Sequence, residues 1–338
     1  MFRRFLAVIL IIVVLITGGC TISTPKFMQK ETPVSNLPAE AILSQQDDIY
    51  NRTIALLNSA KKTIYVEQAS FDDSQLLDLL IKKASSGVEV KVLLDQFRKA
   101  NAATLNQFKS HDISAQFYPA RKGQSNNVKL LVVDHQFALV YGPTWTQEGR
   151  SARDLAVELT GYAAWKASAV FARDWEFTTT LALDIPKTSP APADNIILAT
   201  NAKVKQQLQN LIARSSGSIW LEVTELKDED IIQALVDAKQ KGREVRLLLN
   251  KEYALKEDVQ PVLSLLKSAG VDIRYLQDNS NLRLGIFDGR TFFFSSSGWT
   301  YSTFVINHEF SITVPSPQAA AKLSDLFAQD WANATTKL

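Results

Sequence analysis

The sequence predicts an α/β protein made of two copies of one domain. Ile64 and Ile219, each near the start of a short apolar strand, are 155 residues apart, and so are Gly87 and Gly242, which end the helix that follows each strand. A Phe-Ala-x-Asp-Trp segment near the end of each half recurs after 156 residues. A period of this length fits a whole domain rather than a solenoid unit. Strands alternating with helices predict a largely parallel sheet covered by helices on both faces, and the constant offset argues against the alternative of two unrelated α/β domains.

Residues 1–19 are typical of a secretory signal. Arg3 and Arg4 precede an unbroken apolar run from Phe5 to Ile16, which is shorter than the ~20 residues of a comfortable membrane span. Small residues then lead to Cys20, the only cysteine. This arrangement resembles a bacterial lipoprotein signal and implies a lipid anchor on Cys20, outside the cytoplasmic membrane in the cell envelope. The alternative is an uncleaved N-terminal anchor with an incidental cysteine.

The balance of charge argues against nucleic acid as a partner. The chain carries 37 basic and 35 acidic residues, and without Arg3 and Arg4 the two counts are equal. Sequence-independent nucleic-acid binding needs an excess of Lys and Arg to neutralise phosphates.

One cysteine cannot form an internal disulfide, so the hydrophobic core must hold the fold.

The elements follow one another in a repeated order. Residues 20–44 are polar, contain prolines and lack periodicity, which predicts a tether. We expect domain 1 at 45–185, a proline-rich linker at 186–195, and domain 2 at 196–338. The predicted strands of the first half are 64–67, 88–95, 113–118, 130–133 and 137–141, with helices from Ile54 and at 74–85. The predicted elements of the second half include strands 219–222 and 243–250 around a helix at 231–238.

Two segments, 127–146 and 281–300, share a layout that organises the chain. In each, a cation precedes an apolar strand and a carboxylate follows five positions after the cation; the pairs are Lys129 with Asp134 and Arg283 with Asp288. Each segment ends in Trp-Thr. This pair resembles the two signature motifs of the phospholipase D superfamily, His-x-Lys, four residues, Asp, and then a Gly-Ser-x-Asn loop. The resemblance spans about residues 45 to 335 and implies two α/β/α sandwich domains related by a pseudo-twofold axis, with one site between the motif strands.

The two histidines of the family pattern are absent. Asn127 and Asn281 stand in their positions. The resemblance implies one histidine as nucleophile, forming a phosphohistidine, and the other as general acid; a carboxamide can do neither at neutral pH. We therefore expect no catalytic residue at these positions.

The phosphate-holding groups of the pattern remain in part. Lys129 and Arg283 both suit phosphate oxygens, and Thr144 and Ser296 in the following loops supply hydroxyl groups. The orienting acids implied by the resemblance fall at Asp154 and Glu309. Without a histidine to orient, we expect these carboxylates to pair with the two cations.

Other polar and aromatic residues have two interpretations each. Glu67 and Glu222, at equivalent strand ends, either are solvated or reach the cleft. His308 is expected on the face of its strand opposite Glu309, as an ordinary buried histidine, with a substitute nucleophile as the alternative. Trp145 and Trp299 are expected to pack at the interface or to stack on substrate. No Cys/His cluster or glycine-rich phosphate loop is present, so neither a metal nor a cofactor is expected.

These observations favour a membrane-anchored lipoprotein with a degenerate, catalytically inactive site. It would bind a phosphate or phospholipid head group or serve as an envelope scaffold. The alternative is an active phosphodiesterase of the phospholipase D type that uses a non-standard site.

Overall fold

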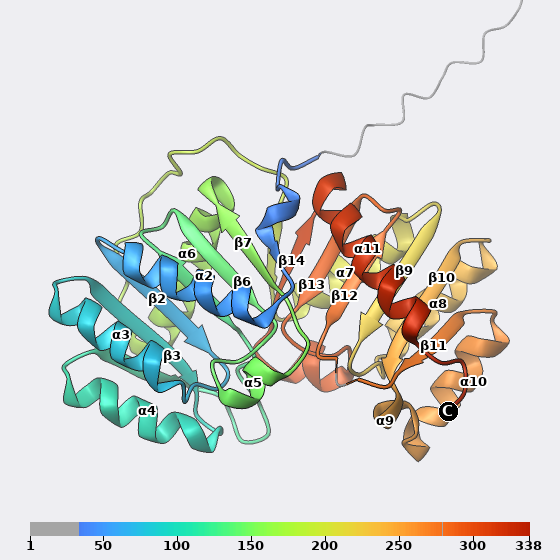
Figure 1. Ribbon diagram of the computed structural model, residues 1–338, viewed down its shortest axis with the longest axis horizontal. Coiled ribbons are helices and arrows are strands. Elements are labelled where there is room, and N and C mark those ends of the chain that lie inside the picture. The colour runs from blue at the N-terminus through green and yellow to red at the C-terminus, as the bar shows by residue number, and fades with distance from the viewer. Residues whose placement is uncertain (1–33, 279) are drawn as a thin grey trace, which may run out of the picture. The chain divides into compact units, whose positions relative to one another are not determined.

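The two predicted copies form two seven-stranded sheets with the same strand order (Figure 1). The structure is a computed structural model that describes residues 34–278 and 280–338; the predicted signal and Cys20 lie outside these residues. The order is β1-β7-β6-β5-β2-β3-β4 in the first half and β8-β14-β13-β12-β9-β10-β11 in the second. Each strand of one sheet therefore has a counterpart in the other, which confirms the predicted duplication.

The seven strands predicted by range correspond to β2 to β6 in the first sheet and to β9 and β10 in the second, whereas β1, β7, β8, β11 and β14 were not predicted. The strands of the first sheet are β1 (Ile42–Leu43), β2 (Thr63–Gln68), β3 (Glu89–Asp95), β4 (Ser114–Tyr118), β5 (Leu130–Val133), β6 (Phe137–Tyr141) and β7 (Ala156–Thr160). Those of the second are β8 (Ile197–Thr200), β9 (Ser218–Val223), β10 (Glu244–Asn250), β11 (Asp272–Leu276), β12 (Arg283–Phe287), β13 (Thr291–Ser295) and β14 (Phe310–Val314).

The prediction of a largely parallel sheet is wrong. In the first half β2 pairs in parallel with β3, and β3 with β4, but the pairs β2–β5, β5–β6, β6–β7 and β7–β1 are antiparallel. The second sheet repeats this pattern. The motif strand β5 is joined to β6 by a three-residue turn, and a connection that short permits only antiparallel pairing. The helical crossovers that parallel pairing needs occur only around β2, β3 and β4 and their counterparts.

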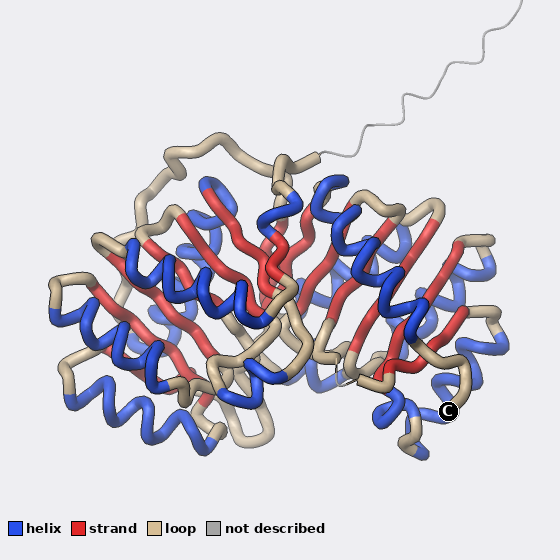
Figure 2. Tube along the Cα trace, viewed as in Figure 1, coloured by secondary structure: helices blue, strands red, loops and turns tan. Residues whose placement is uncertain are grey.

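Helices cover both faces of each sheet (Figure 2). In the first half they are α2 (Gln46–Ser59), α3 (Ser74–Ser85), α4 (Lys99–Ser110), α5 (Gln147–Ser151) and α6 (Gly161–Thr179). In the second they are α7 (Ala202–Arg214), α8 (Glu229–Gln240), α9 (Lys251–Ala254), α10 (Gln260–Ser268) and α11 (Pro317–Asn333). Three short turns complete the list: η1 (Ala39–Ala41), η2 (Glu257–Val259) and η3 (Ser302–Ile306).

One hydrophobic core runs across the boundary between the halves. Phe171 of α6 stacks on Tyr65 of β2 at 4.9 Å, and Phe327 of α11 stacks on Trp220 of β9 at 5.4 Å. These side chains belong to a single apolar cluster that contains residues of both sheets. Burial of apolar area therefore holds the halves together and fixes the geometry between them.

The predicted interface position of Trp145 and Trp299 is wrong, because each packs inside its own half. Trp145 meets Phe71 edge to face at 5.0 Å in the core beneath α2 and α3. Trp299 meets Phe293 at 6.1 Å in the equivalent core of the second half. Both indoles are at most 4% exposed, so neither can stack on a substrate.

The segment before α2 ties the two halves together. The Ser35 amide donates to the Pro315 carbonyl at 2.8 Å, β1 pairs with β7, and the Lys322 ammonium donates to the Ile42 carbonyl at 2.8 Å. The last residues of the predicted tether thus contact both domains. The predicted boundaries of tether and linker stay predictions. None of the helices in residues 34–278 and 280–338 combines the length and hydropathy needed to span a bilayer.

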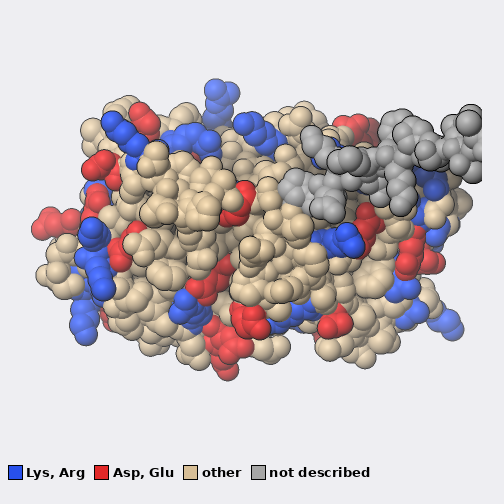
Figure 3. Space-filling model, turned by 90° about the horizontal axis from the view of Figure 1, so that it is seen from above, with Lys and Arg blue, Asp and Glu red and all other residues tan. Residues whose placement is uncertain are grey.

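Charged side chains on the face drawn in Figure 3 are mixed in sign. Lys and Arg lie beside Asp and Glu across this face, as the near-equal counts of 37 and 35 lead one to expect.

Candidate functional site

The two motifs meet at the boundary between the halves. The main-chain N–H of Asn127 donates to the His308 carbonyl at 2.9 Å, and the main-chain N–H of Asn281 donates to the Arg153 carbonyl at 2.8 Å. These equivalent hydrogen bonds join the start of each motif strand to the other half of the chain. A cleft of about 480 Å³ opens there. Its lining includes Asn127, Lys129, Thr144, Asn281, Arg283 and Ser296. The sequence predicted one site between the motif strands, and the structure brings those residues together.

The motif aspartates lie at the opposite ends of these strands. Asp134 accepts hydrogen bonds from the amides of Lys61, Lys62 and Thr63 at 2.8–2.9 Å. Asp288 accepts equivalent bonds from residues 216–218 and from a serine hydroxyl. Burial alone would raise the pKa of Asp288, but these hydrogen bonds outweigh it and hold the pKa below its usual value. Both aspartates therefore fasten a turn and take no part in the cleft.

Lys129 is buried in the wall of the cleft, with 5% of its surface exposed. Its ammonium donates to the Ser296 carbonyl at 2.6 Å and to the Asn127 carbonyl at 3.4 Å. These partners are carbonyl oxygens, not the carboxylates that we expected. Burial, and next the nearby Arg283, lower the pKa of Lys129 to about 7. The group is therefore poised between its charged and neutral forms near physiological pH.

Arg283 pairs with an acid of the other half, as expected. Its Nη1 lies 3.0 Å from Asp154 Oδ2, and its Nε is buried with no protein partner among the described residues. Burial raises the pKa of Asp154, and Arg283 opposes this shift. A Cβ on Gly142 would lie 1.7 Å from Asp154 Oδ1, so only glycine admits this carboxylate. The ion pair uses one side of the guanidinium and leaves its Nε without an acceptor.

Glu309 occupies the equivalent position in the second half but has neutral partners. Its Oε1 accepts from Asn127 Nδ2 at 2.7 Å, and its Oε2 accepts from the Ser296 hydroxyl. Burial raises the pKa of Glu309, and these hydrogen bonds lower it by less. The Ser296 hydroxyl is therefore engaged and is not free to donate to a phosphate oxygen. Thr144 lines the cleft and shares a 3.0 Å hydrogen bond with Thr146.

Glu67 and Glu222 are neither solvated nor in the cleft, so both interpretations of these residues are wrong. They are at most 2% exposed, and neither lines the cleft. Glu222 forms an ion pair with Arg153, which also donates to Asp330 at 2.5 Å and to the Ser280 hydroxyl at 2.9 Å. Burial, opposed by Arg153, raises the pKa of Glu222 to about 7. Arg153 thus joins the halves behind the cleft, a role that we did not predict.

His308 follows its main prediction. It is 2% exposed and lies against Glu67 and Asp174 on the side of the chain opposite Glu309. Burial, and next Asp174, raise the pKa of Glu67 to about 8. All three histidines of the chain are among the described residues, and none lines the cleft.

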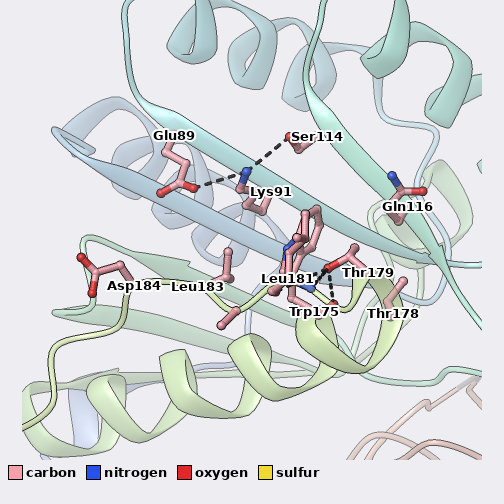
Figure 4. Close-up of a pocket in the computed structure, with 11 residues that line it drawn as sticks. Glu89, Lys91, Ser114, Gln116, Trp175, Thr178, Thr179, Leu181, Leu183 and Asp184 are labelled. Atoms are coloured by element: carbon pink, nitrogen blue, oxygen red, sulfur yellow. Dashed lines mark hydrogen bonds and ion pairs between the residues drawn. The ribbon is translucent and has the colours of Figure 1, made fainter.

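A second hollow, of about 630 Å³, lies away from the motifs (Figure 4). It is bounded by β3, β4 and the end of α6. Its one lysine, Lys91, lies 3.3 Å from both Glu89 and Ser114 and sits over the Trp175 ring at 5.4 Å. The cation is already compensated, so the motif cleft is the better candidate for binding an anion.

The chain matches the family model described as "Cardiolipin synthase, PLD-like domain" twice, over residues 53–175 and 208–331. It is 21% identical to the probable cardiolipin synthase YwiE of Bacillus subtilis (strain 168), over 86% of this chain and 65% of that protein. It is 23% identical to the cardiolipin synthase of Clostridium perfringens (strain SM101 / Type A), over 84% of this chain and 68% of that protein. The chain thus spans slightly less than two thirds of the length of the first of these relatives.

Solved structures share the fold. The phosphatidylserine synthase of Haemophilus influenzae Rd KW20 superposes with a TM-score of 0.68 at 14% identity and 88% coverage of both chains. The polyphosphate kinase of Porphyromonas gingivalis superposes with a TM-score of 0.66 at 17% identity, over 85% of this chain and 46% of that one. At these identities the likeness establishes the fold alone.

Proposed function

This chain belongs to the phospholipase D superfamily, and we propose that its cleft binds the phosphate of a phospholipid head group without cleaving it. The proposal rests on one observation: the cleft keeps both cations of the superfamily pattern and has neither of its two histidines. Lys129 and Arg283 line the cleft, and Asn127 and Asn281 stand where the superfamily pattern has histidine.

Binding is supported by N–H groups of Arg283 and Lys129 that are left without a protein acceptor. Arg283 keeps a buried Nε without a partner, although its Nη1 is paired with Asp154. The Lys129 ammonium donates to two carbonyl oxygens, so one of its three protons remains for an anion. A phosphodiester in the cleft would accept from both cations, and a buried N–H without a partner favours such a ligand.

The absence of turnover is supported by the lack of an imidazole among the described residues that line the cleft. The side-chain amide of Asn127 is held by Glu309, and a carboxamide does not attack phosphorus. The Ser296 hydroxyl donates to the same carboxylate. His308 points away from the cleft toward Glu67 and Asp174.

The phospholipid class of ligand rests on the relatives, which are named as cardiolipin synthases. We propose that this chain, anchored to a bacterial membrane through a lipid on Cys20, binds head groups or serves as a scaffold in the cell envelope. Mass spectrometry of the protein isolated from its membrane tests the anchor. A diacylated Cys20 at the new N-terminus is expected, and an unmodified residue 1 would contradict it.

The test of binding compares vesicles with matched charge changes. Wild type is titrated with vesicles containing cardiolipin or phosphatidylglycerol and with vesicles of phosphatidylcholine alone. We expect Lys129→Met with Arg283→Met to lose at least about tenfold in affinity for the anionic vesicles, since two phosphate contacts are removed.

The control pair, Lys62→Met with Arg290→Met, removes the same charge at exposed positions near the opposite ends of the motif strands. Its affinity for the anionic vesicles, corrected for the loss of two positive charges, should stay within about twofold of the wild-type affinity. Equal losses in both pairs would mean that membrane binding depends on overall charge, and would overturn the assignment of the cleft.

The alternative function is turnover of a phosphodiester by a non-standard site. A chromogenic phosphodiester and phosphatidylcholine, assayed with the same preparation, distinguish the two. We expect no hydrolysis above the background of the Lys129→Met with Arg283→Met variant. Hydrolysis that this variant loses would establish the alternative.

A further inference from the structure

Two equivalent pairs of carboxylates, buried except for the partly exposed Asp330, lie behind the cleft, and each pair faces a nitrogenous side chain from the other half. Glu222 and Asp330 face Arg153. The counterparts in the first half are Glu67 and Asp174, and the side chain that faces them is His308. Arg153 and His308 are themselves equivalent, since each directly precedes one of the two predicted orienting acids, Asp154 and Glu309.

Arg153 bonds to both carboxylates that it faces. Its guanidinium donates to Glu222, Asp330 and the Ser280 hydroxyl, so both carboxylates face a permanent positive charge. An imidazole is smaller and carries fewer donors. The place that a guanidinium occupies in one half is therefore only partly filled in the other.

The tautomer of His308 is set by its other nitrogen. The Asn201 Oδ1 atom accepts from the Glu309 amide at 3.2 Å and lies 2.8 Å from His308 Nδ1. An oxygen that accepts at that position requires Nδ1 to be the donor, so in the neutral ring the Nε2 lone pair points at the carboxylates. A histidine that donates one N–H to a carbonyl oxygen in this way is the usual arrangement of a metal ligand.

Three possible ligand groups converge there. Glu67 Oε2, Asp174 Oδ2 and His308 Nε2 are buried, and the last two lie within ion-pair distance of each other. Glu67 Oε1 accepts from Asn126 Nδ2 at 2.8 Å. Nε2 lies 3.1 Å from Asp174 Oδ2 and 3.7 Å from Glu67 Oε1, and one ligand atom from each of the three residues lies within 4.8 Å of the others. Tetrahedral zinc with bonds of ~2.1 Å separates its ligands by about 3.4 Å, which these distances bracket.

We propose that Glu67, Asp174 and His308 form a site for one divalent transition-metal ion that joins the two halves. The carboxylates come from β2 and α6 of the first half, and the imidazole comes from the second half. Two carboxylates, a neutral imidazole and a divalent cation sum to zero charge, so the ion would balance both buried carboxylates, which otherwise form ion pairs only with the imidazole among the described residues. Tyr118, stacked on the imidazole at 4.3 Å, holds the ring in place.

The role of the ion is structural. It would take the place that the Arg153 guanidinium fills in the other half, and it would fix His308 beside Glu309, which bonds to Asn127 and Ser296 of the cleft. Three protein ligands leave one position of a tetrahedral ion for a water molecule. The proposal stands whether or not the cleft binds head groups.

The test uses untagged full-length protein that has been freed of metal with a chelator and dialysed. Zn²⁺ is titrated against a chromogenic competitor, and thermal unfolding is followed with and without Zn²⁺. We expect one high-affinity ion per chain and a rise in the Tm. His308→Gln should weaken binding by about a hundredfold or more and abolish the rise, because a direct ligand matters at least as much as the groups that orient it.

The matched control is His111→Gln, which removes an exposed histidine at the end of α4. It should bind zinc as wild type does. Equal zinc binding by wild type and His308→Gln, or no stoichiometric binding by wild type, would overturn the site.

X-ray absorption at the zinc edge of the wild type keeps the test independent of how the variants fold. We expect oxygen ligands with a single imidazole. Sulfur ligation, which would indicate Cys20, or more than one imidazole would contradict the proposal.

Discussion

The side-chain amide of Asn127 donates through Nδ2 to the Glu309 carboxylate at 2.7 Å, across the boundary between the two halves. The family resemblance puts a histidine at this position and an acid that orients it. The acid has therefore kept its place and geometry while the group that it would orient has changed to one without acid–base chemistry. The site retains its orienting acid, and what it lacks is an imidazole.

Restoring the imidazoles tests this interpretation. Asn127→His with Asn281→His should gain phosphodiesterase activity on the order of a hundredfold above wild type, since general acid–base groups contribute at least that much. Hydrolysis of a chromogenic phosphodiester measures the gain. A double variant that folds and binds the diester but remains inactive would contradict this interpretation.

The binding of a phosphodiester should weaken as pH rises. Burial lowers the pKa of Lys129 to about 7, and an anion binds the charged form. Affinity should therefore be constant below pH 7 and fall by up to about tenfold per unit above it. Glycerophosphoglycerol is a suitable probe for isothermal titration because the charge of a diester does not change in this range.

Lys129→Arg provides the control for this pH dependence, since arginine stays charged throughout. Its affinity should be nearly independent of pH from 6 to 9. An unchanged pH dependence in this variant would assign the titration to another group.

Gly142→Ala should destabilise the fold by about 1–3 kcal/mol, since overpacking of a filled site costs this much. The added Cβ would lie 1.7 Å from Asp154 Oδ1 and force this carboxylate away from Arg283. Denaturant-induced unfolding gives the difference. Gly217→Ala is the control, because its Cβ would meet Asp288 Oδ1 at an ordinary 3.4 Å. Equal effects of the two substitutions would contradict the close approach.

Asp288→Asn should lower stability and leave head-group binding unchanged. The carboxylate accepts several hydrogen bonds far from the cleft, and losing one acceptor oxygen costs about 1–3 kcal/mol at pH 7. Its folded pKa is depressed, so the stabilisation is present above the unfolded value of about 3.9 and is lost as pH falls below it. The difference in stability between wild type and variant should be smaller at pH 3 than at pH 7 in unfolding curves.

The repeat made much of this architecture predictable. A constant offset aligned the elements of the two halves, and motif spacing placed Lys129 and Arg283 in one cleft. Sheet direction was not predictable in the same way, because strand–helix alternation holds only as far as β4, and the consecutive strands β5 and β6 form a hairpin. The turn after Val133 was the available signal, since a connection of three residues cannot link parallel strands.

The buried polar residues were harder to predict. Glu67 and Glu222 at strand ends look solvated, and their burial depends on Arg153 and His308, which arrive from the other half. No local pattern reports such a contact. The offset of 155 residues between Arg153 and His308 was the signal that could have found them, but it is obscured because the two residue types differ.

The central claim is that the cleft binds a phosphodiester without covalent chemistry. Intact-mass spectrometry of the wild-type protein, acid-quenched or base-quenched during incubation with phosphatidylglycerol vesicles that it demonstrably binds, tests this most directly. We predict an unchanged protein mass at every time point. A protein species heavier by a phosphoryl or phosphatidyl group, accumulating during incubation and absent from Lys129→Met with Arg283→Met, would contradict it.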